Sequence, residues 1–412
     1  MRRRKRRLGA VLFAVLWSLC ACTAGTTPSS ATPSPQPVAS EAPEETPAAD
    51  PLLSRMTLRQ KVGQLFMVRP DALDFSLPQA EIDDDKAKGV QSLTEEMRHT
   101  LEEYPVGGIC QFGKNIRDPK QITDFNAALQ QASEIPLLIS VDEEGGRVAR
   151  LANQPVFDLP QYESALSVGN TGNDAAALEM GQTIGAYLKL YGFNMDFAPV
   201  ADVWTNPDNT VIGARAFSKE PEAAANMAWA MARGLQSEGI LPTFKHFPGH
   251  GDTAQDSHSG LAITEKTRTE MMRCEFLPFL PAEGQTTEAP RAIMVGHIAA
   301  PAMGTGDTPA SLSKTMVTDL LRGELLAGED ALLVTDSLAM GAITEQYGPG
   351  EAAVQAFLAG NDLLLMPAGL EEAFDAVLGA VQNGTIPEER LEESVARIVR
   401  FKEHYAGLNA AA

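Results

Sequence analysis

Three of the chain's six histidines, one lysine and two aspartates fall within fourteen residues, Lys245-His246-Phe247-Pro248-Gly249-His250-Gly251-Asp252-Thr253-Ala254-Gln255-Asp256-Ser257-His258. Residues 240–244, just before this run, are apolar and β-prone, and they predict a strand that delivers Lys245 and His246 to its C-terminal end. The proline and the two glycines that follow predict a loop. Because a loop crowded with titratable groups costs stability, we expect it to have a function.

Two chemistries could use such a loop. One is metal binding, for which the possible ligands are His246, His250, Asp252, Asp256 and His258. The other is proton transfer, with His258 as the acid/base and Asp256 orienting its imidazole. The glycine positions do not match the helix of a zincin, which disfavours the metal. A polar loop with unrelated histidines is also disfavoured, because so few histidines occur elsewhere in the chain.

The run Lys-His-Phe-Pro-Gly-His-Gly, followed by Asp-Ser-His, resembles the signature of the family 3 glycoside hydrolases, in particular their β-N-acetylhexosaminidase branch. The resemblance implies a retaining exo-enzyme that releases terminal N-acetylglucosamine from peptidoglycan fragments or related glycans. It implies no cofactor and no metal. By the same correspondence, His258 is the acid/base and Asp256 is its partner.

The rest of the sequence predicts a barrel. Eight strand-like runs alternate with segments of helical period such as 174–190, 222–238 and 309–326. Alternation of this kind indicates an α/β fold, a single TIM (β/α)8 barrel. The eight runs are 64–68, 107–112, 136–141, 195–200, 241–244, 292–296, 331–335 and 362–366.

The barrel is expected to occupy residues 51–412 as one catalytic domain. Thr57 is a predicted helix cap near its start, residues 69–103 a long acidic connection, and 370–405 a helical tail. We expect no C-terminal sandwich domain of the kind that many relatives carry.

The N-terminus has the layout of a lipoprotein signal. Residues 2–7 are all basic, an apolar segment follows, and Leu19-Cys20-Ala21-Cys22 resembles a bacterial lipobox. This predicts a signal peptide over residues 1–21, a lipid on Cys22, and anchoring at the extracytoplasmic face of the cell membrane. Ordinary signal cleavage nearby and a retained signal anchor are the alternatives.

Residues 22–50 are rich in Thr, Pro, Ser, Ala and Glu, and they predict a disordered tether. The formal charge of −21 argues against a nucleic-acid partner. Cys110 and Cys274 follow the tether and favour buried free thiols over a single bridge. A monomer is expected.

The catalytic roles follow from the resemblance. Val334-Thr335-Asp336-Ser337-Leu338-Ala339-Met340 resembles the family's nucleophile motif, which makes Asp336 the carboxylate that forms the glycosyl intermediate. The alternative for Asp336 is a cap of the following helix.

Five further residues match family positions that bind the sugar. Carboxylates accept from vicinal hydroxyl groups and arginines supply several fixed donors. The five are Asp142, Arg150, Arg215, Lys245 and His246. Arg147 and Asp202 are left outside this set, because structural ion pairs explain them equally well. His250 and Asp252 are expected to shape the loop, and His297 to line the pocket or to lie in the core.

Three other functions remain open on the sequence. A β-glucosidase is disfavoured, because the Asp256–His258 pair points to the acetamido branch of the family. A phosphorylase of the same family would use phosphate in place of water. A lipid-anchored glycan-binding protein with an inactive barrel would bind a muropeptide or another N-acetylglucosamine-containing glycan without cleaving it. The predicted nucleophile and acid/base argue against the inactive barrel.

Overall fold

The computed structural model describes residues 51–253, 260–281 and 291–408. Cys22, Asp256 and His258 lie outside the described residues, as do the predicted signal peptide and tether. Within those ranges, no helix combines the length and the apolarity that crossing a membrane requires.

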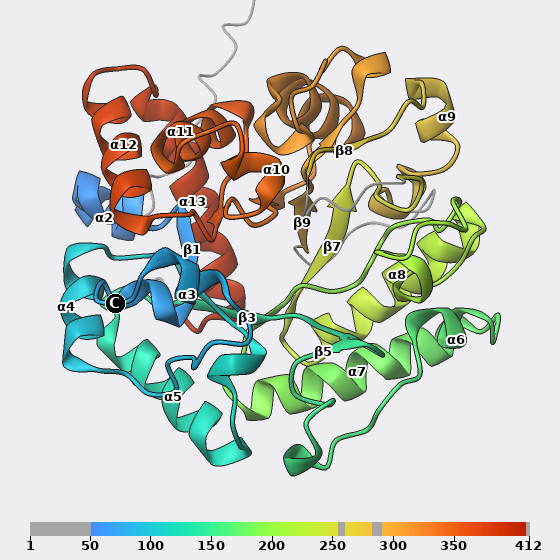
Figure 1. Cartoon of the computed structure of the whole chain (residues 1–412), viewed down its shortest axis with the longest axis horizontal. Coiled ribbons are helices and arrows are strands. Elements are labelled where there is room, and N and C mark those ends of the chain that lie inside the picture. The colour runs from blue at the N-terminus through green and yellow to red at the C-terminus, as the bar shows by residue number, and fades with distance from the viewer. Residues whose placement is uncertain (1–50, 254–259, 282–290, 409–412) are drawn as a thin grey trace, which may run out of the picture. The chain divides into compact units, whose positions relative to one another are not determined.

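Eight parallel strands form one sheet in the order β11-β9-β7-β6-β3-β2-β1-β12 (Figure 1). A parallel bridge between Val334 and Leu363 joins the first and last strands of this order, so the sheet closes into a barrel. Every residue of these strands is buried, as expected for a parallel sheet covered by helices. The predicted TIM barrel is therefore confirmed. The strands are β1 (Phe66–Val68), β2 (Gly108–Gln111), β3 (Leu138–Val141), β6 (Met195–Asp196), β7 (Leu241–Phe247), β9 (Arg291–Val295), β11 (Ala331–Thr335) and β12 (Leu364–Leu365).

All eight predicted runs contain a barrel strand, but only the run 331–335 has the predicted bounds, and three of the differences concern how the strands end. Strand β7 continues through Phe247, so Lys245 and His246 lie within the strand and not after it. Strand β6 ends at Asp196, shortly before Pro199, which has no backbone N–H to donate to the ladder. Strand β12 ends before Met366, whose φ of 47° is incompatible with a strand.

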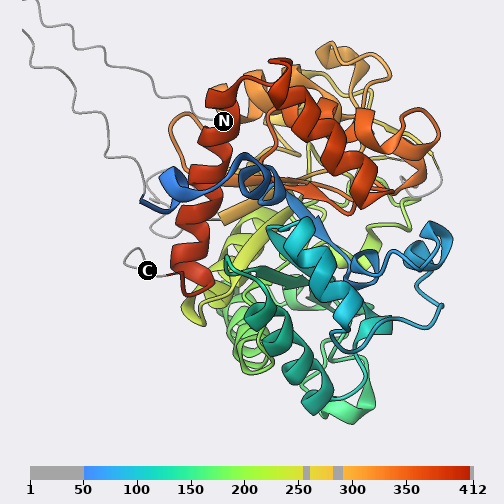
Figure 2. The same cartoon turned by 90° about the vertical axis from the view of Figure 1, so that its left-hand side faces the viewer.

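The helices pack on the outside of the barrel, where α7 and α8 lie side by side. Figure 2 shows the long C-terminal helix α13 in red along one side of it. Helix α7 covers the predicted range 174–190, and α8 is displaced by one residue from the predicted 222–238. The larger helices are α4 (Glu95–Glu103), α5 (Pro119–Ala132), α7 (Asp174–Leu190), α8 (Pro221–Ser237), α11 (Pro349–Ala359), α12 (Leu370–Gln382) and α13 (Glu388–Tyr405).

The helix predicted over residues 309–326 is replaced by a short 3₁₀ turn, Ala310–Leu312 (η7), and a π-helix, Thr315–Leu325 (η8). Met316, Val317 and Leu320 are still buried together on one face. Hydrophobic periodicity predicts which face is buried, but it does not distinguish the hydrogen-bond spacings of the helix types.

Shorter elements complete the fold. Thr57 caps α2 through a capping box with Gln60, which confirms the predicted cap. The short helices are α1 (Pro51–Arg55), α2 (Leu58–Gly63), α3 (Gln79–Asp83), α6 (Ala165–Gly169), α9 (Arg268–Met272) and α10 (Gly341–Thr344). Strands β4 (Glu143–Gly145) and β5 (Val148–Ala149) form a hairpin, and β8 (Ala262–Ile263) pairs with β10 (Ile298–Ala299). The 3₁₀ turns are η1 (Pro70–Leu73), η2 (Gly113–Asn115), η3 (Pro155–Phe157), η4 (Gly213–Arg215), η5 (Leu277–Phe279) and η6 (Pro301–Met303).

Both cysteines in the described ranges are free thiols. Cys110 is buried on β2, as predicted, and burial raises the pKa of its thiol to about 12. Cys274 is only partly buried, because it follows the short helix α9 near the surface, so the prediction of a buried thiol is wrong there.

Candidate active site

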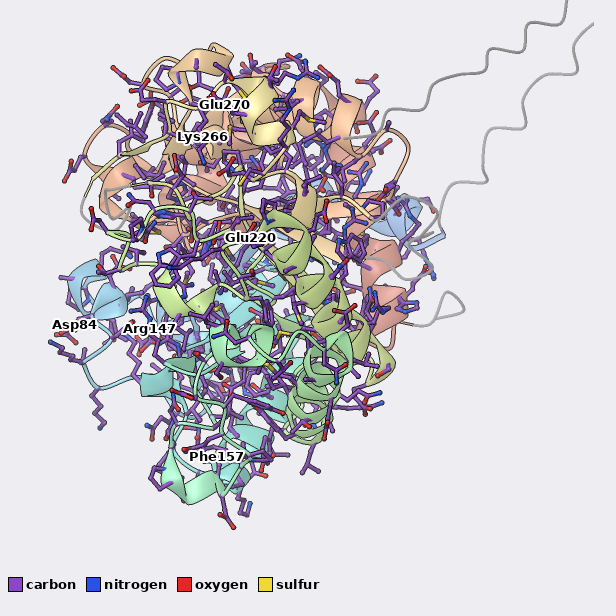
Figure 3. All side chains as sticks on the ribbon, turned by 90° about the vertical axis from the view of Figure 1, so that its right-hand side faces the viewer. Asp84, Arg147, Phe157, Glu220, Lys266 and Glu270 are labelled. Atoms are coloured by element: carbon purple, nitrogen blue, oxygen red, sulfur yellow. The ribbon has the colours of Figure 1, made fainter. Side chains whose placement is uncertain are left out.

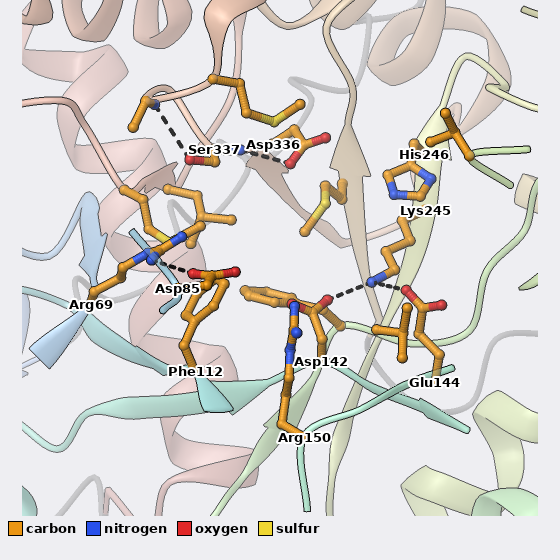
Figure 4. A pocket seen from close by; sticks show the side chains of 18 of the residues that line it. Arg69, Asp85, Phe112, Asp142, Glu144, Arg150, Lys245, His246, Asp336 and Ser337 are labelled. Atoms are coloured by element: carbon orange, nitrogen blue, oxygen red, sulfur yellow. Dashed lines mark hydrogen bonds and ion pairs between the residues drawn. The ribbon is translucent and has the colours of Figure 1, made fainter. Parts of the chain in front are cut away.

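A cavity of about 370 Å³ opens at the carboxyl ends of the barrel strands (Figure 4). All the described members of the predicted site line this one cavity, although they come from distant parts of the sequence. They are Asp142, Arg150, Arg215, Lys245, His246 and Asp336. This placement agrees with the rule that TIM barrels build their sites at the carboxyl ends of the strands.

Lys245 is the electrostatic centre of one wall. Its ammonium lies 2.6 Å from a carboxylate oxygen of Asp142 and 2.7 Å from one of Glu144, and its side chain is 2% exposed. Burial acts to lower the pKa of Lys245, but the two carboxylates outweigh burial and hold that pKa above its usual value. Lys245 is therefore a fixed cation beside Asp142, which is suited to hold sugar hydroxyl groups.

Glu144 is a member of the wall that the sequence analysis missed. Its carboxylate accepts two hydrogen bonds from Arg215, at 2.8 and 2.6 Å, in addition to the ion pair with Lys245. Burial acts to raise the pKa of Glu144, but Arg215 and Lys245 hold it far below its usual value. Side chains alternate along an extended segment, so Asp142 and Glu144, two residues apart after β3, point to the same side. This alternation could have identified Glu144 as a second carboxylate of the wall.

The hairpin β4–β5 presents Arg150 to the same wall. Glu143 points the other way and accepts backbone hydrogen bonds from Leu151 and Ala152, both at 2.9 Å, and one from the Tyr187 hydroxyl at 2.9 Å. Burial raises the pKa of Glu143. Glu143 thus fixes the segment that follows Arg150.

His246 is oriented by Asp202. The imidazole Nδ1 lies 2.7 Å from Asp202 Oδ2, and Asp202 Oδ1 accepts the backbone N–H of His250 at 2.6 Å. Burial acts to raise the pKa of Asp202, but His246 and His250 lower it below its usual value. With Nδ1–H donating to this carboxylate, Nε2 of His246 is left as the second ring nitrogen for a ligand. Asp202 is a positioning residue, which agrees with the structural role that kept it outside the predicted set.

Arg147 has a structural role as well, but through backbone carbonyls and not through the ion pair that the sequence suggested. Its guanidinium donates to the backbone carbonyls of Thr210 and Val211, and it does not line the cavity.

His250 does more than shape the loop. It lines the cavity, and its ring centre lies 5.9 Å from that of His246. Burial, followed by the neighbouring His246, lowers the pKa of His250. Asp252, in contrast, forms an ion pair of 3.1 Å with Lys266, which agrees with a role in holding the loop.

Asp336 follows β11 and is partly exposed in the cavity. Its backbone N–H donates to Val295 on β9 at 2.9 Å, and its Oδ1 accepts the N–H of Ser337 at 2.7 Å. Asp336 also precedes α10 by five residues and is not its N-cap, which is Met340. The capping alternative for Asp336 is therefore wrong.

His297 is a core residue. It is fully buried, and its two ring nitrogens lie 2.8 Å from Ser311 Oγ and 2.8 Å from the Ser337 carbonyl. His297 is not among the residues that line the cavity. Of the two possibilities left open by the sequence, the core position is the observed one.

The wall opposite Lys245 was not predicted. Arg69, Phe112 and Asp85 form it, and Asp83 lines it as well (Figure 4). The sequence predicts a long acidic connection over residues 69–103, and nothing in its spacing indicates that this connection lies beside β2.

The described ranges contain no group of three or more histidine, cysteine or carboxylate side chains arranged to hold a metal ion. Two of the five ligands considered from the sequence, Asp256 and His258, lie outside these ranges.

Comparison with known proteins places the chain in a family. Residues 57–401 match the model of the glycosyl hydrolase family 3 N-terminal domain. The chain is 33% identical to β-hexosaminidase A of Pseudoalteromonas piscicida over 84% of its own length, but it spans only 61% of that relative. It is 32% identical to β-hexosaminidase LpqI of Mycobacterium tuberculosis, over 95% of this chain and 96% of LpqI.

Comparison with solved structures agrees with the family match. A family 3 β-N-acetylglucosaminidase from Paenibacillus sp. superposes with a TM-score of 0.76 at 37% identity, covering 87% of this chain and 64% of the other. The structure of M. tuberculosis LpqI gives a TM-score of 0.72 at 30% identity, covering 87% and 97%. The family model spans most of the barrel, and these relatives are similar to the chain in both sequence and fold. The chain therefore belongs to glycosyl hydrolase family 3.

Proposed function

We propose that this chain is a retaining exo-β-N-acetylhexosaminidase that hydrolyses terminal N-acetylglucosamine from peptidoglycan fragments or related glycans. One observation carries the proposal: Asp336 shares a single cavity with Asp142, Lys245 and His246, which are the positions the family motif assigns to the nucleophile and the sugar ligands. Relatives named as β-hexosaminidases support the substrate class. A cavity of about 370 Å³ has room for one terminal sugar.

In the first step, a carboxylate oxygen of Asp336 bonds to the anomeric carbon while the glycosidic C–O bond breaks. The departing oxygen takes a proton from His258. The Ser337 N–H, 2.7 Å from Asp336 Oδ1, fixes the orientation of the carboxylate. The roles of His258 and Asp256 in this proposal rest on the sequence motif.

In the second step, water attacks the anomeric carbon and gives its proton to His258, and the bond to Asp336 breaks. Two inversions at one carbon give net retention. Throughout, Asp142 and Lys245 hold hydroxyl groups of the sugar, and Arg150, Arg215 and His246 complete the ligand set. Because Lys245 and Asp142 are paired before substrate arrives, little reorganisation is needed on binding.

The proposed organisation of the chain is a lipoprotein signal peptide over residues 1–21, a tether over 22–50 and the catalytic domain over 51–412. Cys22 would carry the lipid and hold the enzyme at the extracytoplasmic face of the membrane. Cys22→Ala should release the protein from membranes or leave its precursor uncleaved, and a variant that fractionates and migrates like the wild type contradicts the anchor.

The proposed activity is tested by comparing the hydrolysis of an aryl N-acetylglucosaminide and an aryl glucoside. We expect the first to be cleaved faster, with the β-anomer as the first product detected by NMR. Sugar 1-phosphate formed in phosphate buffer would indicate a phosphorylase. No turnover of either substrate, with N-acetylglucosamine still bound, would indicate a glycan-binding protein.

A further inference from the structure

Besides the histidines, four cationic side chains in the described part of the chain line the cavity: Arg69, Arg150, Arg215 and Lys245. Lys245 and Arg215 are both held by the buried carboxylate of Glu144 at 2.8 Å or less. Arg69 donates to the Ile82 carbonyl, to Met366 Sδ and to Asp85, which is its only carboxylate partner among the described residues, and Arg150 has fewer contacts. Both guanidinium groups approach the ring of Phe112. The guanidinium carbon of Arg69 lies 3.7 Å from the centre of that ring, and that of Arg150 lies 5.3 Å from it.

Arg150 has hydrogen-bond donors to spare. Its closest carboxylate is Asp142, at 3.8 Å, which is too long for a hydrogen bond. Its Nε is buried and has no partner among the described residues. A buried donor without an acceptor costs free energy. A ligand that accepts a hydrogen bond from Arg150 therefore gains more binding free energy than one that binds a solvated arginine.

Arg69 is paired with a carboxylate that is easily displaced. Nη1 of Arg69 lies 2.8 Å from Asp85 Oδ1, but the side chain of Asp85 is 52% exposed, against 11% for Arg69. Ion pairs with one exposed partner contribute little to stability. An incoming anion can therefore replace Asp85 at low cost.

The turn that carries Asp85 is fixed independently of that ion pair. The Lys114 ammonium donates to the backbone carbonyls of Glu81 and Ile82, both at 2.8 Å, and of Asp84 at 3.2 Å. Exchange of the anion then requires only that the Asp85 side chain rotate toward solvent.

We propose that Arg69 and Arg150, on the ring of Phe112, form an anion subsite within the cavity that takes a carboxylate or phosphate group (Figure 4). Guanidinium groups match the planar or tetrahedral oxygens of such anions better than any other side chain. When no anion is bound, the carboxylate of Asp85 pairs with Arg69. The inference rests on the proposed function in taking the anion to accompany an amino sugar, so acidic amino sugars are the substrate class it favours.

The test is calorimetric binding of four probes that have no glycosidic bond to cleave: N-acetylglucosamine, N-acetylmuramic acid, N-acetylglucosamine 6-phosphate and inorganic phosphate. We expect one acidic sugar to bind about 10-fold more tightly than N-acetylglucosamine, the scale of a hydrogen bond to a charged group. Tighter binding of N-acetylmuramic acid would identify a sugar carboxylate as the ligand, and tighter binding of N-acetylglucosamine 6-phosphate would identify a sugar phosphate. Tight binding of inorganic phosphate alone would identify a free ion as the ligand.

Two variants should move this preference in opposite directions. Arg69→Gln should abolish it, and Asp85→Asn should increase it about threefold, since an exposed competing ion pair is removed. Asp84→Asn is the matched control: it removes the same charge from the same turn, but Asp84 lies at the outer edge of the molecule (Figure 3) and does not line the cavity.

The proposal is overturned if no anionic probe binds better than N-acetylglucosamine, or if Asp85→Asn weakens or leaves unchanged the preference. Since Asp85→Asn keeps Arg69 and the Lys114 contacts, a folding defect does not explain such a result. Failure of N-acetylglucosamine itself to bind would instead contradict the proposed function, while a preference that depends on Arg69 would still support the anion subsite.

Discussion

Two buried charge clusters of similar composition lie at opposite ends of the barrel strands. The pocket cluster, at the carboxyl ends, consists of Lys245, Asp142, Glu144 and Arg215, and all four line the cavity. The amino-end cluster lies beside the starts of β11 and β12, and none of its members lines the cavity. It consists of Asp362, Arg322, Arg397 and Ser394.

In the amino-end cluster, the carboxylate is fully enclosed. Asp362 accepts from Arg397 at 2.7 Å, from the Ser394 hydroxyl at 2.6 Å and from the Leu333 N–H at 2.9 Å, and Arg322 completes the set. Asp362 is 0% exposed. These contacts tie β12 to β11 and to α13, where the barrel closes.

In the pocket cluster, Asp142 has an 18% exposed side chain and faces the cavity. Paired acids and bases therefore close the barrel at one end of the strands and line the cavity at the other. Asp142 lies at the carboxyl ends of the strands and Asp362 at the amino ends. In a TIM barrel, sites form at the carboxyl ends, and the amino ends contribute to stability.

The largest expected effect is on kcat, from a substitution at the carboxyl ends of the barrel strands. Asp336→Ala should reduce kcat by about 10⁴-fold or more, because the covalent route is lost. The thermal midpoint should move little, since the side chain of Asp336 is partly exposed. Steady-state kinetics and thermal unfolding of the same preparation check both parts.

A fluorinated N-acetyl-sugar analogue should label the wild-type peptide that contains Asp336. Labelling of a different carboxylate would remove Asp336 from the role of nucleophile.

The next effect separates proton donation from sugar binding. A nitrophenolate leaves with little protonation, whereas a sugar alcohol needs a proton. His258→Ala should therefore slow the cleavage of a disaccharide about 10²–10⁴-fold more than glycosylation by an aryl substrate. Asp256→Asn should show a milder form of the same pattern, because the imidazole loses its orienting charge. Equal losses on both substrates would assign His258 to binding.

The third prediction concerns the amino-end cluster and should affect stability alone. Asp362→Ala leaves Arg322 and Arg397 without their buried partner and should lower the free energy of unfolding by about 3–5 kcal/mol. kcat per folded molecule should be retained, because the cluster does not touch the cavity. Denaturant unfolding and active-site titration measure the two quantities.

Asp330→Ala is the matched control for Asp362→Ala. Asp330 also pairs with Arg397, at 3.2 Å, and with Arg400, at 3.0 Å, but its side chain is 46% exposed. Loss of these exposed pairs should cost about 1 kcal/mol, well below the cost of Asp362→Ala. A loss of kcat in the folded Asp362→Ala protein would mean that the two ends of the barrel are coupled.

The comparison also shows what the sequence could predict. The apolar runs predicted all eight strands, and strand order then placed Asp142, Lys245 and Asp336 at one end of the barrel. The sequence could not show that Glu144 and Lys245 touch, because their contact depends on the neighbouring positions of β3, β6 and β7 in the closed sheet.

The Arg69–Asp85 wall was missed for a different reason. Charged residues without period are typical of solvated surface, but here Arg69 and Lys114 bind backbone carbonyls of the connection and hold it beside the cavity. Contacts between a side chain and a distant carbonyl leave no pattern in the sequence.

The smallest expected effect concerns a third kind of buried charge. Lys402 on α13 is 0% exposed and donates to Gln64, and no carboxylate in the described ranges forms an ion pair with it. Burial lowers the pKa of Lys402 from 10.5 to about 7. Lys402 therefore lacks the partner that both clusters provide.

The pH dependence of the Lys402 effect follows from that shift. Between pH 10.5 and about 7 the unfolded chain binds the proton and the folded chain does not, so wild-type stability falls as the pH is lowered through this window. Below about pH 7 the folded protein carries the buried charge and the full penalty is present. Lys402→Met should stabilise the protein by about 2 kcal/mol at pH 6 and by less as the pH approaches 10, since an apolar side chain of similar length replaces an unpaired charge. Denaturant unfolding at both pH values measures the difference, and a stabilisation that grows with pH would show that Lys402 is charged and paired in the folded state.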